Sequence, residues 1–207
     1  MYVRNLRKSS PVKKVYKFAS FKNRSIIMCE SSLERDCCYH LEYSKDVVAF
    51  QSQPEGFYYS SGNKRYPYTP DFLVQNQDGS EYFIEVKPLN KIFPEDFKNT
   101  FALKRIAAKK LGKPLVLVTD EQIRKGSFLE NLKLSHRYSR LMDTDTSLIC
   151  VVDELRAIGP MCIRSLANNL KLSVGEVIAI VFCLIGLDKV NVSLDTVINE
   201  MSVISVN

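Results

Sequence analysis

The feature that most constrains the fold is a strand pair expected in residues 68–88, which read YTPDFLVQNQDGSEYFIEVKP. The apolar run FLV leads into Asp78-Gly79, a dipeptide that suits the left-handed positions of a tight turn, and the run YFI leads back out. Apolar residues occupy both alternating faces of the two strands. The pattern therefore predicts a β-hairpin that is buried on both sides.

Three charged residues interrupt this apolar pattern at the open end of the hairpin. Asp71 and Glu85 lie close to Pro70 and Pro88, so their carboxylates can converge on one spot. Lys87 shares a face with Glu85 because strand side chains alternate with a period of two. Two carboxylates beside a lysine predict a Mg²⁺ site, since this ion takes one or two carboxylates together with waters and a substrate phosphate.

A simpler alternative is a solvated hairpin face on which Asp71 and Lys87 pair across the strands. Burial on both sides disfavours this alternative, because a carboxylate in a buried strand needs a partner or a metal ion. The spacing also favours a site: Pro-Asp, thirteen residues and Glu-Val-Lys form the PD-(D/E)xK pattern of restriction-like nucleases.

The surrounding sequence predicts an α/β unit in which helices flank a mixed central sheet. Helical periodicity begins at Ser31 and again after Pro94, where the second helix ends at Gly112. In chain order we expect a helix at 31–43, strands at 47–52, 57–59, 72–74 and 82–86, a helix at 97–111, a strand at 115–118 and a helical region at 120–138.

The balance of charge changes sign near a short polar linker at residues 143–147. Residues 1–140 hold 25 of the 29 Lys and Arg residues and 15 of the 23 acids, a net charge of +10, whereas the remainder carries −4. The basic part predicts a polyanionic partner. We expect a basic arm at 1–29, a nuclease domain at 30–141 and a C-terminal domain at 147–207.

The expected basic arm carries eight cations, interleaved with aromatic residues, before the first acid at Glu30. These cations could contact DNA phosphates, or they could belong to a solvated tail. A neighbouring nuclease core favours DNA contact. The expected DNA-binding residues are Arg4, Arg7, Lys8, Lys13, Lys14, Lys17, Lys22 and Arg24.

The C-terminal domain has a winged-helix pattern, with helices expected at 148–158, 161–170 and 173–185 and a small wing at 187–192. The third helix contains no Lys or Arg, and its single charge, Glu176, has the wrong sign for contact with phosphates. This helix is therefore predicted to be buried in its domain or to fit a protein groove, and not to read DNA.

Four segments together carry a family resemblance: CESSLERDCCYHLEY, QSQPEGFYY, YTPDFLV and IEVKP. They resemble the TnsA family, the endonuclease subunit of heteromeric cut-and-paste transposases, over roughly residues 5–140. The resemblance implies a restriction-endonuclease-like core with a small winged-helix-like C-terminal α domain. It also implies hydrolysis of the 5′ strand of double-stranded DNA at transposon ends, beside a DDE-type transposase that cuts and joins the 3′ ends. The C-terminal domain would dock that transposase or its AAA+ ATPase regulator.

Carried over to this chain, the resemblance gives Glu34, Asp71, Glu85 and Lys87 as catalytic residues. Asp71, Glu85, the Val86 carbonyl and Glu34 would hold two Mg²⁺ ions, for which Mn²⁺ could substitute. Some family members have glutamine where this chain has Glu85. Glu34 has a second reading from the residues alone, because Ser31-x-x-Glu34 is a capping box in which the glutamate serves the helix start.

Two other functions are compatible with parts of this pattern. A free-standing restriction-like nuclease or junction resolvase would use the same chemistry, but it would gain little from an acidic docking domain. A non-catalytic DNA-binding adaptor could keep a nuclease core for its shape, but it would have no need to keep all four catalytic residues.

The sequence also suggests where the protein works. Its longest apolar run, at 177–185, is shorter than the roughly 20 residues that a bilayer span needs, and no apolar signal region follows the N-terminal cations. Its six cysteines contain no C-x-x-C pair, which suits a reducing compartment. We therefore expect a bacterial cytoplasmic protein that makes no membrane contact and joins the nucleoid when bound to DNA.

Overall fold

A computed structural model describes residues 14–139 and 146–207 of the chain. Contacts divide the chain into two compact units, Met1–Ile123 and Arg124–Asn207. Of the expected DNA-binding residues, Arg4, Arg7, Lys8 and Lys13 lie outside the described residues.

The first unit is built around a mixed four-stranded sheet in the order β3-β6-β7-β8. The strands β3, β6 and β7 pair antiparallel, whereas β7 and β8 pair parallel. The expected mixed central sheet is therefore confirmed. The four strands are β3 (Val47–Ser52), β6 (Phe72–Asn76), β7 (Glu81–Lys87) and β8 (Leu115–Thr119).

The strand pair β6–β7 is the hairpin that the sequence predicts. Gly79 adopts φ +80°, and its N–H donates to the Asn76 carbonyl at 3.0 Å. The Asp78 carboxylate accepts a hydrogen bond from the Ser80 N–H at 2.9 Å, which fixes the turn. Both strands have a neighbour on each edge, so the open end of the hairpin lies in the interior of the sheet.

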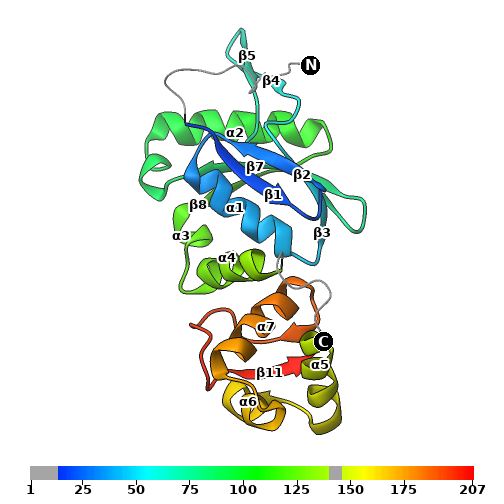
Figure 1. Cartoon of the computed structure of the whole chain (residues 1–207). Coiled ribbons are helices and arrows are strands. Elements are labelled where there is room, and N and C mark those ends of the chain that lie inside the picture. Colours follow the sequence, from blue (N-terminus) through cyan, green and yellow to red (C-terminus); the bar gives the residue numbers. More distant parts are fainter. Residues whose placement is uncertain (1–13, 140–145) are drawn as a thin grey trace. The chain divides into compact units, whose positions relative to one another are not determined.

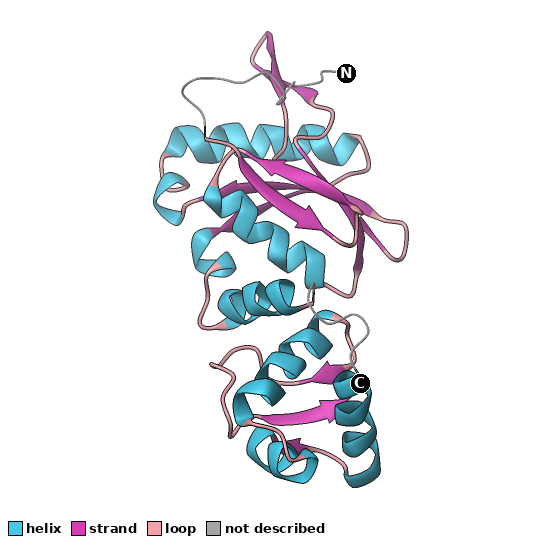
Figure 2. Ribbon diagram, viewed as in Figure 1, coloured by secondary structure: helices cyan, strands magenta, loops and turns pink. Residues whose placement is uncertain are grey.

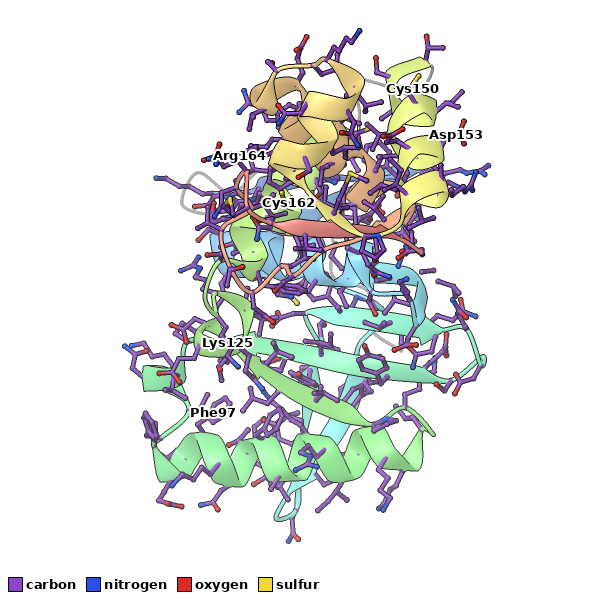
Figure 3. The ribbon with its side chains drawn as sticks, turned by 90° about the horizontal axis from the view of Figure 1, so that it is seen from below. Phe97, Lys125, Cys150, Asp153, Cys162 and Arg164 are labelled. Atoms are coloured by element: carbon purple, nitrogen blue, oxygen red, sulfur yellow. The ribbon has the colours of Figure 1, made fainter. Side chains whose placement is uncertain are left out.

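Helices cover both faces of this sheet (Figures 1 and 2). On one face lies α1 (Ser32–Tyr43). The rings of Phe72 and Phe50 pack against each other with their centroids 6.4 Å apart. On the other face lies α2 (Glu95–Lys110), which Figure 3 shows running along the sheet. Phe101 of α2 belongs to the same buried cluster as Phe83. The predicted burial on both sides is confirmed, which explains why apolar residues do not alternate with polar ones in these strands.

Residues 16–29, expected to lie in a separate arm, form a hairpin that belongs to the first unit. Its strands are β1 (Tyr16–Ser20) and β2 (Ser25–Cys29). Phe18 and Ile27 are buried, and the Phe18 ring meets that of Tyr39 in α1 edge-on at 4.9 Å. Alternate apolar side chains therefore anchor this segment to α1. The many cations of the segment obscure this alternation in the sequence.

The turn of this hairpin is tied to the C-terminal end of α1 by Lys22 and Glu42. The Lys22 ammonium donates to the carbonyls of Leu41, Ser44 and Val47 at 3.0, 2.7 and 2.5 Å. The Glu42 carboxylate accepts from the backbone N–H groups of Phe21 and Lys22 at 2.8 and 2.9 Å. A cation at the carbonyl end of a helix is stabilising, so Lys22 has a structural role.

Three smaller elements complete the first unit. Strands β4 (Phe57–Ser61) and β5 (Lys64–Tyr68) pair only with each other, in a second hairpin outside the central sheet. A 3-10 turn, η1 (Leu89–Lys91), follows β7, and a short helix, α3 (Asp120–Ile123), follows β8.

The described residues of the second unit form four helices and a small sheet in the order β10-β11-β9. Helices are present in the three ranges expected from the sequence, and a short strand lies within the range expected to form a wing, whereas β9 and β11 were not expected. The elements are α4 (Phe128–Tyr138), α5 (Thr146–Ile158), β9 (Met161–Cys162), α6 (Ile163–Leu170), α7 (Val174–Gly186), β10 (Val190–Asn191) and β11 (Val203–Val206).

The helix α4 belongs to this second unit, although the sequence placed it in the nuclease domain. Tyr138 of α4 stacks on Phe182 of α7 with ring centroids 5.9 Å apart. The Asn131 amide donates to the carbonyls of Leu194 and Thr196, both at 2.8 Å. The division between units therefore falls between Ile123 and Arg124, before α4, and not at residues 141–147.

The helix α7 is the centre of the second unit. Val177, Val181 and Cys183 are fully buried, which supports the expectation of a core helix. In the described parts of the chain, no single helix is long and apolar enough to cross a membrane. The pair α6 and α7, bent by 111° at the break between them, meets that criterion together, by length and composition only.

Candidate active site

The open end of the β6–β7 hairpin brings Asp71, Glu85 and Lys87 together as the spacing predicts. The backbone N–H of Asp71 donates to the Ile84 carbonyl at 3.0 Å, which continues the strand register. The Asp71 carboxylate in turn accepts the N–H of Val86 at 2.7 Å. The aspartate is therefore held against the segment Glu85-Val86-Lys87 by both its backbone and its side chain.

The Glu85 carboxylate is almost completely buried, with 4% of the residue exposed, and both of its oxygens have partners. Tyr68 donates its hydroxyl to Oε2 at 2.5 Å, and the Lys87 ammonium lies 3.1 Å from Oε1. The Lys87 side chain is 39% exposed. The lysine therefore links a buried carboxylate to the protein surface.

Asp71 lies among more negative than positive charge. Burial, followed by the charges of Glu85 and Glu34, raises the pKa of Asp71 to about 7, although the Val86 N–H and Lys87 act in the opposite direction. Burial lowers the pKa of Lys87, but Glu85 and Asp71 outweigh this effect and raise it overall. The negative charge of Glu85 and Glu34 thus acts on Asp71 together with the ammonium group of Lys87, which remains charged.

Glu34 has the capping role that its spacing suggested. It lies near the start of α1, where Ser31 Oγ accepts the Glu34 N–H at 3.1 Å. The Glu34 carboxylate accepts the backbone N–H of Glu30 at 2.9 Å and the Ser31 hydroxyl at 2.8 Å. The glutamate therefore reaches one residue beyond the helix N-cap.

The same carboxylate also belongs to the electrostatics of the site. Burial raises the pKa of Glu34, while the Glu30 N–H, the Ser31 hydroxyl and the charge of Lys87 lower it. A carboxylate has about four lone-pair positions, and the cap uses two of them. The capping and catalytic readings of Glu34 are therefore compatible.

Three residues that the sequence did not single out also contact the site. Gln53 adopts φ +45°, and its backbone N–H donates to the Asp71 carbonyl at 2.8 Å. Tyr68 binds Glu85, and the Lys104 ammonium lies 4.0 Å from the centre of the Tyr68 ring. Lys104 comes from α2, so only tertiary packing brings it here, and no local spacing could have revealed it.

Lys104 is a second cation at the site. Burial lowers the pKa of Lys104, and the charge of Lys87 lowers it further, while Glu85 and Asp71 raise it. The position of this ammonium over a ring that itself binds Glu85 is a cation–π contact. Two lysines therefore flank the Glu85 carboxylate, one from its own strand and one from α2.

The segment that carries this geometry matches a known family. Residues 44–120 match the family described as TnsA-like endonuclease N terminal. This segment is a TnsA-like endonuclease domain. The match implies nuclease activity, and it confirms the resemblance over the range that contains Asp71, Glu85 and Lys87. Glu34 lies outside the matched range. No curated protein matches the chain significantly.

The donor set of the TnsA-like domain suits a small divalent metal such as Mg²⁺. Asp71, directly before β6, and Glu85, in the adjacent strand β7, supply two carboxylates whose shared negative charge would be relieved by a cation. In residues 14–139 and 146–207, no three His, Cys, Asp or Glu side chains are grouped to hold a metal ion. Two carboxylates, the Val86 carbonyl and waters nevertheless match the preference of Mg²⁺.

The expected DNA-binding cations of the basic segment divide into two groups. Lys14, Lys17 and Arg24 are exposed and remain available for DNA contact. The Lys22 ammonium, in contrast, is bound by three backbone carbonyls, and burial lowers its pKa. Lys22 therefore stabilises the end of α1 and is less suited to DNA contact than the three exposed cations.

Proposed function

We propose that the chain is a Mg²⁺-dependent DNA endonuclease that hydrolyses the 5′ strand at transposon ends as a subunit of a heteromeric transposase. The observation that carries this proposal is the convergence of Asp71, Glu85 and Lys87 within a TnsA-like endonuclease domain. The mixed sheet with its acids on interior strands supports a restriction-endonuclease-like fold for the first unit.

The chemistry assigns a separate task to each residue of the site. Asp71, Glu85, the Val86 carbonyl and Glu34 would hold the metal, with two ions per site and Mn²⁺ able to substitute. A bound divalent cation would supply a water of lowered pKa and would offset charge on the scissile phosphate. Lys87, which is half-exposed and paired with Glu85, would orient that water or the phosphate. The products would carry a 5′-phosphate and a 3′-hydroxyl.

The second unit would provide the partner contacts. Its helices and small antiparallel sheet support a winged-helix-like fold, and α7, which has no Lys or Arg and is largely buried, is not suited to enter DNA. We infer that this unit docks a DDE-type transposase or an AAA+ ATPase regulator. The protein would then act in the bacterial cytoplasm, on transposon ends within the nucleoid.

The decisive experiment is Mg²⁺-supported cleavage of transposon-end DNA, with and without the partner transposase. Asp71→Asn should reduce cleavage at least 100-fold, because it removes the carboxylate charge while keeping an oxygen for the Val86 N–H. Asp78→Asn, at the opposite end of the same hairpin, is the matched control and should cut like the wild type.

Each alternative function gives a different result in this experiment. Equal cleavage by wild type and Asp71→Asn would refute the proposed site. Full activity without a partner transposase would favour a free-standing nuclease. DNA binding without any metal-dependent cleavage, even with the partner present, would favour a non-catalytic adaptor.

A further inference from the structure

The β4–β5 hairpin is an exposed projection of the first unit. Residues 60–67 are all exposed, and Gly62, at φ +56°, forms its tip. Figure 1 shows the hairpin extending past the edge of the unit on the side of α2, and Figure 3 shows the same from below. A two-stranded hairpin that is exposed along most of its length contributes little to the hydrophobic core. Such a projection is better explained by contact with a binding partner.

The base of this hairpin is part of the active-site wall. Tyr68, its last residue, binds Glu85 at 2.5 Å and lies beneath the Lys104 ammonium. The ring of Phe57, its first residue, packs against the rings of Tyr68 and Phe83, with centroids 5.2 and 5.4 Å apart. The direction of the hairpin is therefore fixed relative to the residues proposed to cut DNA.

The charge of the hairpin fits a polyanion. Residues 57–68 contain Lys64 and Arg65 and no acid. The guanidinium of Arg65 lies 5.3 Å from the centre of the Tyr58 ring, which restricts its orientation. The open groove between this hairpin and α2 is lined by three cations and one acid, namely Arg65, Lys110, Lys113 and Glu55.

A nucleic acid duplex suits this projection better than a protein strand does. The major groove of B-DNA admits a two-stranded β-ribbon, whereas the minor groove is too narrow. Pro67, in β5, has no N–H to give to an incoming strand, which makes the β5 edge a poor template for β-strand addition.

We propose that the β4–β5 hairpin enters the major groove of the duplex beside the cleaved phosphate, with Lys64 on a phosphate and Arg65 on a base edge. This proposal rests on the proposed nuclease function and adds a DNA-reading element to it. Lys64 lies four residues from Tyr68, or about 13 Å at the rise of a strand. That length corresponds to about four base pairs of DNA.

The test measures binding of duplex DNA by the full chain in chelating buffer, where no cleavage occurs. Lys64→Ala should weaken binding and reduce the salt dependence by about one phosphate contact. Arg65→Ala should weaken binding of a guanine-containing site about tenfold, and Arg65→Lys should keep the salt dependence but lose the base preference. Lys45→Ala, near the turn end of β6–β7, is the charge-matched control and should bind like the wild type.

Guanine modification identifies the groove. Arg65 is one residue nearer to Tyr68 than Lys64 is, about 10 Å or three base pairs away. Replacement of guanine by 7-deazaguanine about three base pairs from the cut removes the major-groove N7 acceptor and should weaken the wild type but not Arg65→Ala. The proposal would be overturned if Lys64→Ala and Arg65→Ala both bound DNA with the affinity, the salt dependence and the sensitivity to 7-deazaguanine of the wild type. The nuclease function would fail separately, if the wild type with Mg²⁺ and its partner left the DNA uncut.

Discussion

Asp71 illustrates how one residue couples the site to pH. Its folded pKa of about 7 lies above the usual value of 3.8, chiefly because of burial and then because of Glu85 and Glu34. The folded protein therefore holds a proton that the unfolded chain has lost between about pH 4 and pH 7. In this range the contribution of Asp71 to the free energy of unfolding must fall as pH rises.

We expect the stability difference between Asp71→Asn and the metal-free wild type to grow with pH. The asparagine side chain at position 71 is uncharged at every pH. The free energy of unfolding of Asp71→Asn, taken relative to that of the wild type, should therefore rise by about 1 to 3 kcal/mol from pH 4.5 to pH 8. Urea denaturation in chelating buffer measures this difference. Saturating Mg²⁺ at pH 8 should stabilise the wild type and leave Asp71→Asn unchanged.

The control for this prediction is Asp78→Asn. Hydrogen bonds from Ser80 lower the pKa of Asp78, so its contribution is constant above pH 4.5 and the difference from wild type should not change with pH. A constant difference for Asp71→Asn as well would mean that Asp71 is already ionised at acidic pH.

Lys22 offers a test of structural against DNA-binding roles at the scale of one side chain. Lys22→Met keeps the aliphatic stem but leaves three carbonyls without their donor, so the free energy of unfolding should fall by about 1 to 3 kcal/mol. Lys17→Met, on the exposed face of β1, should change stability little. A salt titration of DNA binding completes the comparison: a reduced salt dependence in folded Lys22→Met would restore its role as a phosphate contact.

At the scale of elements, the start of α1 combines helix capping with the proposed chemistry. Glu34→Gln keeps an acceptor for the Glu30 N–H but loses the charge, so stability should change by less than about 1 kcal/mol while cleavage falls at least tenfold. Ser31→Ala removes the N-cap and should lower stability by about 1 kcal/mol with a smaller loss of cleavage. Denaturation and cleavage assays on both variants separate the two roles. If Glu34→Gln cleaved DNA as fast as the wild type, helix capping would be the sole role of Glu34.

The elements also differ in how far the sequence could predict them. The β6–β7 hairpin was predictable because its turn, its apolar runs and its charges are all local. The β1–β2 hairpin was not, because its many cations suggested a separate DNA-binding arm although Phe18 and Ile27 anchor it. The site shows the same contrast: Asp71, Glu85 and Lys87 share one strand pair, whereas Lys104 arrives by the packing of α2.

At the scale of the whole molecule, the position of α4 defines which segments can fold alone. A fragment of residues 124–207 retains the Tyr138–Phe182 stack and the Asn131 hydrogen bonds, so it should unfold cooperatively. A fragment that begins at residue 147, the boundary expected from charge, lacks α4 and should be less stable by several kcal/mol. Thermal denaturation followed by circular dichroism compares the two, and equal stability would return α4 to the nuclease unit.

The sequence missed this boundary for a physical reason. Charge changes sign near residue 143, but a core is defined by apolar contact, and α4 presents its buried face to α7. Composition shows where the surface charge of a chain changes. It does not report which helix covers which core.

The parallel pairing of β7 with β8 has a consequence for the order of synthesis. Glu85 and Lys87 lie in β7, but the second edge of that strand stays open until α2 has crossed over and Thr119 has paired beside Lys87. On the ribosome, the acids would therefore remain on an unfinished sheet edge until that strand has emerged. The nuclease unit would then be complete while the second unit, which begins at Arg124, is still being made.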